Sequence, residues 1–370
     1  MSIEIKRVET KKDLAKFIDF HYDLYKGNAY DAPTLFFDDM NTLSRDKNVA
    51  FDFCEAEYFM AYKDGKLAGR VAAIINNRAN EKFGKKDVRF GWIDFVDDIE
   101  VTKALFDAVE AWGKSKGMTA MVGPLGFTDL DPEGMLIMGF DKLGTMPTIY
   151  NYPYYPEHME KLGGWVKDND YVEYYLPMPE KTPEKFAKLS AMIEKRYNLH
   201  VKKITKKDVK HGTIVYDLYG YVELTERQID DYVKSYLPML DLNLVTLVVD
   251  GNKDDKLIGV GVTMPSMARA MQKCHRGRLF PFGWWHLLRA LKFHKTEGVD
   301  LLLIGFLPEY RTKGANALLF ADLIPRYIDY GFKWGETNVE MEDNSSVQSQ
   351  WGNLEHINHK RRRCYRKQIG

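Results

Sequence analysis

A helix-like pattern occurs twice in this chain, and this repetition limits the possible folds more than any other feature of the sequence. Residues 102–118 and 316–332 align without a gap, so that Gly117 in the first stretch matches Gly331 in the second. Both stretches carry apolar residues at three-and-four spacing, and a glycine at the end of such a run typically ends a helix. The sequence therefore predicts two similar helices in distant parts of the chain.

Each predicted helix lies between two predicted strands. Apolar runs at 88–95 and 119–123 flank the first helix, and runs at 299–307 and 333–341 flank the second. A strand, a helix and a second strand of these lengths predict a parallel pair of strands joined by a right-handed crossover.

A predicted hairpin precedes each of these units. Residues 61–77 read as two strands joined by a polar turn at Asp64 and Gly65, and residues 247–264 repeat that pattern. Two common units can resemble each other by chance, but the shared order of hairpin and crossover favours duplication. We therefore predict an α/β fold of the mixed α+β kind, with two similar domains. Each would hold a mixed, mostly antiparallel sheet with a parallel central pair flanked by helices.

The boundary between the domains is predicted at a cluster of three prolines between residues 177 and 183, where a strand gives way to a helix. The predicted domains are therefore residues 1–178 and 179–370. The chain length is sufficient for two hydrophobic cores.

Composition excludes several classes of protein. Basic and acidic residues number 53 each, so the net charge gives no indication of nucleic-acid binding. Three widely spaced cysteines argue against a disulfide framework and suit a reducing compartment. The N-terminal stretch has no apolar signal core, and no apolar run approaches the roughly 20 residues that span a bilayer. We expect a cytoplasmic protein with no membrane span. We expect no metal site, because His356 and His359 lack an obvious third ligand.

The turn before the second helix has the chemistry of an anion site. Gly314 permits a positive φ, and the helix that follows directs free N–H groups and the positive end of its dipole at the turn. Arg311 and Lys313 add positive charge, and Thr312 adds a further donor. Neither a nucleotide-binding P-loop nor a GxGxxG pattern is present. The alternative reading is a plain connector between a strand and a helix.

The run from Ile304 to Ile324 resembles the acyl-CoA-binding motif of the GNAT acyltransferase superfamily. In that motif an apolar strand ends in a hydrophobic-x-Pro-x-Tyr pattern. An arginine or glutamine follows, then two residues, a glycine, one residue, and a glycine or alanine. The matching positions here are Leu307, Pro308, Tyr310, Arg311, Gly314 and, in place of the last small residue, Asn316.

The resemblance extends beyond the motif and implies a site for acetyl-CoA or another acyl-CoA in the second domain. Asn344 matches an asparagine that follows the fifth strand, and Trp351 stands where many members carry a tyrosine. The implied acyl-CoA-binding residues are Phe306, Leu307, Arg311, Thr312, Lys313, Gly314, Ala315, Asn316 and Asn344.

The first domain resembles the same fold without this site. At the matching positions, Asp97 replaces Arg311 and Glu100 replaces Gly314, so the loop is acidic where phosphates would lie. We therefore predict that the first domain does not bind CoA at this loop. It would shape the acceptor pocket or stabilise the second domain. The whole chain resembles a tandem GNAT protein.

The resemblance also implies a mechanism. A backbone N–H near Phe306 and Leu307 would polarise the thioester carbonyl, and an acceptor amine would attack it directly. Glu336 is the candidate general base, and its alternative role is a strand-end carboxylate that faces solvent or pairs with a lysine. The indole of Trp351 cannot titrate, so Tyr310 is the candidate acid, and the alternative is that the thiolate leaves without an acid.

Three functions remain open at this point. The first is an acyl-CoA-dependent N-acyltransferase, with acetyl transfer to a small-molecule or peptide amine. The second is a non-catalytic GNAT-fold protein that binds acyl-CoA or a partner. The third is an aminoacyl-tRNA-dependent transferase that uses the basic tail at 358–368. We do not expect nucleic acid there, because the tail reads as a final strand with its charged residues facing outward.

The second domain also carries an insert at 265–298, which reads as helical and amphipathic. It would pack against a domain, form a lid or a wall for an acyl chain, or bind a membrane surface.

Overall fold

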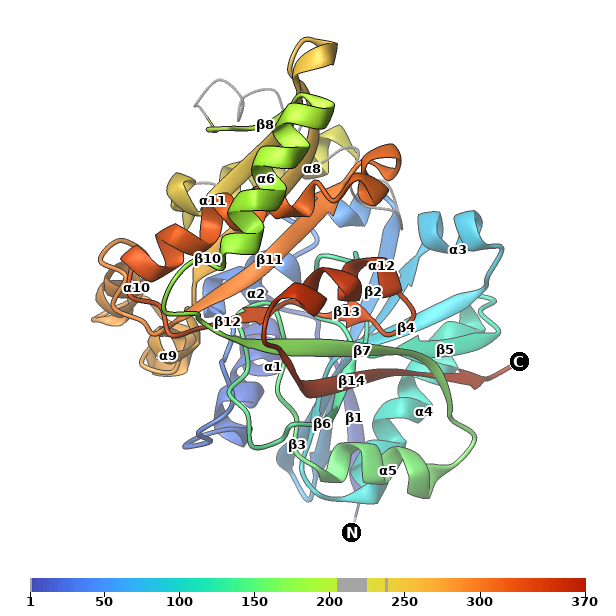
Figure 1. The fold of residues 1–370 in the computed structure, drawn as a ribbon. Coiled ribbons are helices and arrows are strands. Elements are labelled where there is room, and N and C mark those ends of the chain that lie inside the picture. The colour runs from blue at the N-terminus through green and yellow to red at the C-terminus, as the bar shows by residue number, and fades with distance from the viewer. Residues whose placement is uncertain (1, 205–224, 237–238) are drawn as a thin grey trace. The chain divides into compact units, whose positions relative to one another are not determined.

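The computed structural model describes residues 2–204, 225–236 and 239–370 (Figure 1). They form two compact units. Unit 1 comprises Met1–Val172, Ala268–His286 and His359–Gly370, and unit 2 comprises Glu173–Met267 and Leu287–Asn358. Each unit therefore contains segments that are distant in the sequence. The division into duplicated halves at residue 178 stays a prediction.

Unit 1 is built on a mixed sheet with the strand order β1-β2-β3-β4-β5-β14. β4 and β5 are parallel, with Asp87 opposite Ala120, and the other neighbours in this order are antiparallel. The strands are β1 (Ile3–Arg7), β2 (Cys54–Lys63), β3 (Lys66–Asn76), β4 (Asp87–Phe95), β5 (Ala120–Gly123), β14 (Ile357–Gln368) and β6 (Met135–Met138), which pairs with β14. The helices are α1 (Lys11–Leu24), α2 (Phe36–Thr42), α3 (Asn77–Phe83), α4 (Ile99–Ser115), α5 (Tyr154–Leu162) and α9 (Ala268–Met271), with short 3-10 turns η1 (Val49–Asp52) and η5 (His275–Gly277).

Helices cover both faces of the unit 1 sheet. Because side chains alternate along a strand, β3 supplies Val71 and Ala73 to one core, which includes Leu105 of α4. Its intervening residues, such as Ala72, enter a second core with Phe17 of α1. The sheet thus lies between α4 on one face and α1 on the other.

Unit 2 is built on the strand order β7-β12-β11-β10-β9-β8, with β7 divided between the two units at residue 172. β11 and β12 are parallel, with Gly298 opposite Trp334. The strands are β7 (Val166–Pro177), β8 (Leu199–Lys202), β9 (Val245–Asp250), β10 (Lys256–Pro265), β11 (Gly298–Phe306), β12 (Trp334–Thr337) and the short β13 (Glu340–Met341). The helices are α6 (Glu184–Tyr197), α8 (Glu226–Tyr236), α11 (Asn316–Asp329) and α12 (Ser345–Gln348), with 3-10 turns η3 (Leu242–Leu244), η4 (Gly251–Lys253), η6 (Pro308–Lys313) and η7 (Ser349–Asn353). The remaining helix, α10 (Gly283–Leu291), begins in unit 1 and ends in unit 2.

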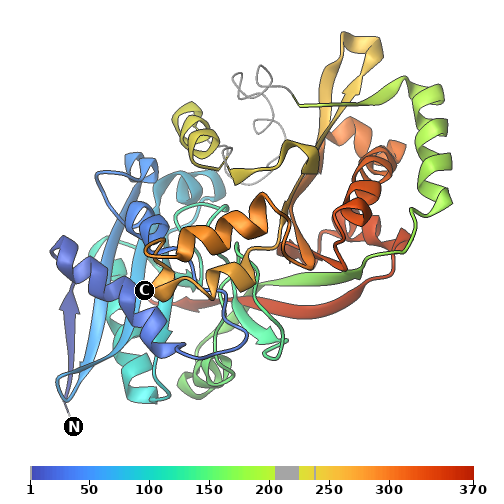
Figure 2. The ribbon, with the colours of Figure 1, turned by 90° about the vertical axis from the view of Figure 1, so that its left-hand side faces the viewer.

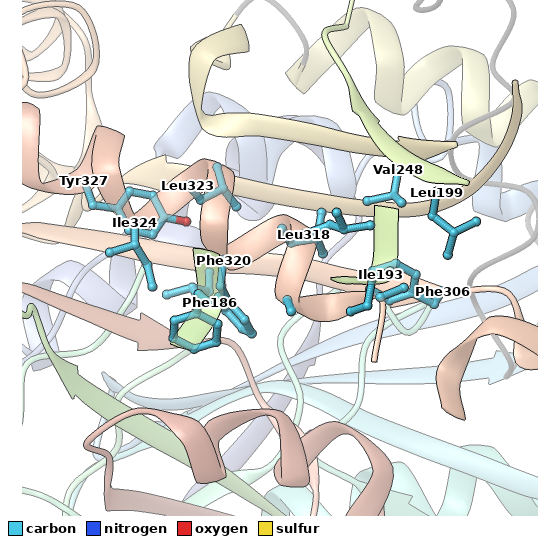
Figure 3. Close-up of a cluster of buried hydrophobic side chains, with 14 of the residues drawn as sticks. Phe186, Ile193, Leu199, Val248, Phe306, Leu318, Phe320, Leu323, Ile324 and Tyr327 are labelled. Atoms are coloured by element: carbon cyan, nitrogen blue, oxygen red, sulfur yellow. The ribbon is translucent and has the colours of Figure 1, made fainter. Parts of the chain in front are cut away.

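The core of unit 2 forms between its sheet and the helices α6 and α11, which lie side by side (Figure 2). Figure 3 shows the apolar side chains of α11, such as Leu318 and Phe320, packed with Phe186 and Ile193 of α6. Val248 of β9 belongs to the same cluster. This core fixes the start of α11 relative to the end of β11.

The structure confirms the repeated elements. Both hairpins, both central parallel pairs and both crossover helices are present. Gly117 and Gly331 follow the two helices with φ of 78° and 79°, the left-handed conformation expected of a C-terminal glycine. The predicted strand at 333–341 differs, since it is divided into β12 and β13.

The insert at 265–298 is helical, as predicted, and its first part belongs to unit 1. Arg276 and Arg278 both reach Asp19 of α1, at 3.2 and 3.0 Å. The residues from Ala268 to His286 are thus tied to unit 1, although they interrupt the sequence of unit 2.

The prediction for the basic tail was wrong in one respect. Residues 357–368 form the predicted strand, β14, but Lys360 and Arg362 on it are buried instead of facing solvent. The ammonium of Lys360 donates to the backbone oxygen of Leu143 at 3.0 Å, and Arg363 binds the Asp170 carboxylate at 2.7 Å. Partners inside unit 1 therefore take up charges that the sequence alone placed in water.

Among the described residues, no helix is both long and apolar enough to cross a bilayer. Cys54, Cys274 and Cys364 are buried free thiols.

Candidate functional site

The turn between β11 and α11 brings the predicted phosphate-binding residues together in unit 2. Leu307 leads into the 3-10 turn η6, and Gly314 ends that turn with φ of 72°. Ala315 then occupies the N-cap of α11 and has no side-chain group that accepts a hydrogen bond. Because the first N–H groups of a helix need outside acceptors, the entry of α11 is suited to an anion.

Two cationic side chains accompany this turn. The ammonium of Lys313 lies 4.2 Å from the centre of the Tyr310 ring, which holds it close to η6. Arg311 is exposed, and its Nε donates to the backbone oxygen of Phe306 at 3.0 Å. This bond holds the guanidinium of Arg311 near the end of β11, and its role in binding an anion stays a prediction. Thr312 and Asn316 flank these residues on η6 and at the start of α11.

Tyr310 is buried, and its hydroxyl is engaged away from the helix entry. It donates to Asp250 at 2.6 Å, and the ammonium of Lys253 donates to it at 2.9 Å. Burial and the Asp250 carboxylate both raise the pKa of Tyr310. The tyrosine thus ties η6 to the turn between β9 and β10, and its role as a catalytic acid stays a prediction.

The strands β11 and β12 separate just before this turn. Their parallel register runs from Gly298 opposite Trp334 to Leu301 opposite Thr337. Just after this register, the backbone N–H of Asn338 donates a hydrogen bond to the backbone oxygen of Leu301, at 3.0 Å. β11 continues to Phe306, so its last residues extend beyond the end of β12.

The backbone direction at the end of β11 distinguishes the two predicted donors. The N–H of Leu307 donates to the oxygen of Ile258 on β10, at 2.9 Å. Successive residues of a strand direct their N–H groups to opposite edges. The N–H of Phe306 is therefore directed to the edge from which β12 has departed. The ring of Phe306 packs over Gly259, where a Cβ would lie 2.2 Å from it, so this residue is held firmly.

Glu336 is buried on β12, next to Asp300 of β11 in the parallel register. The alternative reading of a solvent-facing strand end therefore does not describe its environment. Asn344 caps α12, since its side-chain oxygen accepts from the N–H of Val347 at 3.3 Å. The roles assigned to Glu336 and Asn344 both stay predictions.

Glu340 is a titratable group that the sequence did not single out. The indole N–H of Trp351 donates to both of its carboxylate oxygens, at 2.9 and 3.2 Å. Burial raises the pKa of Glu340 to about 8, although the Trp351 bond opposes this shift. A tryptophan in place of the usual tyrosine was noted from the sequence, but its carboxylate partner becomes evident only in the fold.

The matching turn in unit 1 already holds its own anions. The Asp98 carboxylate caps α4 by accepting from the N–H of Glu100 at 3.1 Å, and it also pairs with Lys63. Asp97 pairs with His158 at 3.0 Å. Carboxylates of the chain therefore occupy the helix entry in unit 1, in contrast to the entry of α11 in unit 2.

The fold has counterparts among solved structures. One is a tandem GNAT protein from the clavulanic acid biosynthesis pathway, which superposes with a TM-score of 0.57 and 12% sequence identity. The superposition covers 100% of this chain and 99% of that protein. The chain has the tandem GNAT fold. The two parallel pairs with their crossover helices are the repeated parts of the tandem GNAT fold that the sequence predicted.

Curated proteins resemble this tandem GNAT chain over nearly its whole length. It is 28% identical over 380 residues to Protein YghO of Escherichia coli strain K12, covering 97% of this chain and 94% of that protein. It is 26% identical over 380 residues to the Bacterial ceramide synthase of Caulobacter vibrioides, covering 98% and 96%. No protein-family profile matches the sequence.

Proposed function

We propose that this chain is an acyl-CoA-dependent N-acyltransferase whose cofactor binds at the turn between β11 and α11. The observation that carries the proposal is the contrast between the two helix entries. Asp98 caps α4 with a carboxylate, whereas α11 begins at an alanine behind a left-handed glycine. Arg311 and Lys313 add positive charge to the second entry only. Such an entry favours the pyrophosphate of CoA.

The end of β11 supports the transfer step. With the pyrophosphate at α11, the pantetheine arm would enter where β11 and β12 separate. The N–H of Phe306 is directed to this edge and would donate to the thioester oxygen as negative charge develops on it. The nitrogen of the acceptor amine attacks the carbonyl carbon, the carbon–sulfur bond breaks, and CoA leaves as a thiolate.

Two protons must move in this reaction. The amine loses one, and Glu336 remains the proposed base. The thiolate gains one, for which Tyr310 is one proposed source. We propose Glu340 as the other, because its carboxyl is bound by the indole of Trp351, at the position of the superfamily's usual tyrosine, and because burial raises its pKa to about 8. The indole of Trp351 would hold this carboxyl in place, which gives the residue a role without requiring it to titrate.

The acceptor class is proposed from the relative named Bacterial ceramide synthase. Ceramide is the amide of a fatty acid with a long-chain amino alcohol, so forming its amide bond is an N-acyl transfer. A sequence identity of 26% over 98% of this chain favours an amphipathic amine as the acceptor. It also favours a fatty acyl-CoA over the acetyl-CoA expected from the motif.

The test is a thermal-shift titration with CoA, acetyl-CoA and palmitoyl-CoA, followed by thiol release in the presence of amines. Gly314→Glu should abolish the shift, because it places a carboxylate at the helix entry as in unit 1. Gly331→Glu is the matched control, since it lies at the other end of the same helix with a similar φ and open space around its Cβ. If no CoA compound shifts the wild-type protein, or if both variants bind equally well, the proposal is wrong. Binding without thiol release would instead support the non-catalytic alternative.

A further inference from the structure

Unit 1 contains a pocket where β4 and β5 separate. Their register ends at Arg89 opposite Val122, and the pocket lies beyond it, between Gly91–Asp94 of β4 and the loop that starts at Pro124. It encloses about 560 Å³ of space, including open solvent at its mouth.

The floor of the pocket holds a buried charge network. The two nitrogens of His21 lie 3.1 Å from Asp94 and 3.3 Å from Asp31. Burial alone would lower the pKa of His21, but these two carboxylates raise it to about 10, so the imidazole carries a positive charge. Arg70 adds a second cation, with its Nε 2.8 Å from Asp94. All four side chains line the pocket.

The wall of the pocket contains a third carboxylate, that of Asp39. Among the residues that the structure describes, two neutral groups donate to it, the indole of Trp92 at 3.1 Å and the hydroxyl of Thr34 at 2.7 Å. Trp92 adopts a φ of 42°, which is strained for a large residue, while its indole holds this bond. Three carboxylates against two cations leave one negative charge in excess. The field of Asp39 contributes, after burial, to a pKa of about 6 at neighbouring Asp38.

The rest of the wall is apolar. Ile93, Pro124, Pro132 and Ile149 line the same pocket. A buried negative charge is costly unless a cation compensates it, and the apolar wall favours a hydrocarbon next to that cation. The pocket therefore complements both parts of an amphipathic amine, its cationic head and its hydrocarbon chain.

We propose that this pocket binds the acceptor amine as an ammonium ion, with Asp39 as its counter-ion and the apolar wall against its aliphatic chain. The identification of this amine as the acyl acceptor rests on the proposed N-acyltransferase function. As the acceptor, the amine would leave Asp39 and lose the ammonium proton before its nitrogen attacks, and it would lose one further proton as the amide bond forms. The binding itself depends on unit 1 alone.

Calorimetric titration of the full chain with 1-aminohexane, and with hexan-1-ol as its neutral counterpart, tests the proposal. The amine should bind at least ten times more tightly than the alcohol, and Asp39→Asn should remove that preference. The matched control is Asp46→Asn, an exposed carboxylate paired with Lys11, which should change neither affinity. Equal affinities for amine and alcohol in the wild-type protein refute the proposal whatever the variant does.

Failure of the pocket and failure of the proposed function give different results. An enzyme that releases thiol with amines, but whose KM for the amine is unchanged in Asp39→Asn, retains the function and excludes this pocket. A chain that binds 1-aminohexane through Asp39 but no CoA compound retains the pocket and excludes the function. Gly314→Glu should bind the amine as the wild-type protein does.

A separate observation concerns an exposed aromatic segment in unit 1. Phe280 and Phe282 are 78% and 70% exposed, and Trp284 and Trp285 are 45% and 42% exposed. These four large side chains lie within six consecutive residues at the start of α10. Farther along this helix, Leu287 and Leu291 are buried and belong to its packed face.

The residues around this segment carry an excess of positive charge. Residues 266–296 contain seven arginines and lysines and no aspartate or glutamate, although the whole chain has no net charge. Arg276 and Arg278 use Asp19 as a partner. For Lys273 and Arg289 no salt bridge is found within the described part of the chain, which leaves their charge for an outside anion.

We infer that residues 280–285 insert into the surface of an anionic bilayer. Exposed aromatic side chains, tryptophan above all, favour the interface between headgroups and acyl chains. The charge complementarity specifies an anionic surface, because basic residues flank the aromatic segment without any acid among them. Exposed apolar patches of this kind mark a site of interaction.

Flotation with vesicles of phosphatidylcholine and phosphatidylglycerol, in a ratio of 7:3, tests this inference. The full chain should float with these vesicles at least ten times more than with pure phosphatidylcholine, and high salt should reduce the difference. The double variant Phe282→Ser with Trp285→Ser should lose the binding. The matched control is Phe83→Ser with Val166→Ser, which removes two apolar side chains that are also exposed, at 49% and 60%.

Three results would overturn the inference: no flotation of the wild-type chain, equal flotation with both vesicles, or equal loss in both double variants. Light scattering provides the remaining check. A dimer that the Phe282→Ser, Trp285→Ser variant dissociates would show that a second copy of the chain covers the segment.

Discussion

Replacing Glu340 by glutamine should change how the stability of the protein depends on pH. The pKa of Glu340 rises from 4.5 to about 8 on folding, chiefly because the carboxyl is buried. Between these values the folded chain holds a proton that the unfolded chain has released. The free energy of unfolding therefore falls as the pH rises through this window, and it levels off above pH 8.

The size of this effect follows from the shift. Each unit of pKa difference between the folded and the unfolded chain corresponds to about 1.4 kcal/mol in the free energy of unfolding. The shift of Glu340 can therefore lower this free energy by at most roughly 5 kcal/mol. Glu340 retains some contact with solvent, which reduces the expected loss to roughly 3 kcal/mol between pH 5 and pH 9. Glutamine stays neutral throughout and can still accept the bond from Trp351, so Glu340→Gln should lack this loss.

Urea denaturation of the wild-type protein and the variant from pH 5 to pH 9 measures the difference. The two proteins should have similar stability at pH 5, and the variant should be the more stable one at pH 9. Glu184→Gln, at an exposed carboxylate paired with Lys188, is the control and should follow the wild-type protein. Parallel curves for Glu340→Gln and the wild-type protein would refute the argument, because they would show that Glu340 titrates normally.

Two further substitutions test the turns that precede α11 and α4. Tyr310→Phe removes the donor to buried Asp250 and should cost about 1 to 3 kcal/mol in urea denaturation; a fall in kcat of more than tenfold would instead support the predicted acid role. Asp98→Ala removes the cap of α4 and should cost about 1 kcal/mol, seen as a lower Tm. An unchanged Tm would mean that the N–H of Glu100 finds another acceptor without loss.

The parts of the fold that were predicted from the sequence depend on short-range patterns. The helix of residues 316–329 follows from apolar spacing, and its C-terminal end follows from Gly331 in the left-handed conformation. The turn at Gly314 was found in the same way, since glycine and the charges beside it are neighbours in the sequence. Such features need no knowledge of distant partners.

The parts that were missed depend on pairs of residues far apart in the chain. Lys360 is buried, and its ammonium donates a hydrogen bond to the backbone oxygen of Leu143, a partner that no local pattern indicates. The pocket of unit 1 likewise joins Asp39 of α2 to Trp92 of β4. The raised pKa of Glu340 depends on its burial in the folded chain, which sequence position does not reveal.

The place of β14 in unit 1 has a consequence for biosynthesis. Its last residues pair with β5, with Tyr365 opposite Gly123 and Gln368 opposite Ala120. The ribosome makes these residues after every segment of unit 2, so unit 1 cannot complete its sheet before the whole of unit 2 has been made. Until then β5 presents an unpaired edge, the kind of surface that chaperones protect and that promotes aggregation. Unit 2, whose segments are all made before His359, can finish folding first.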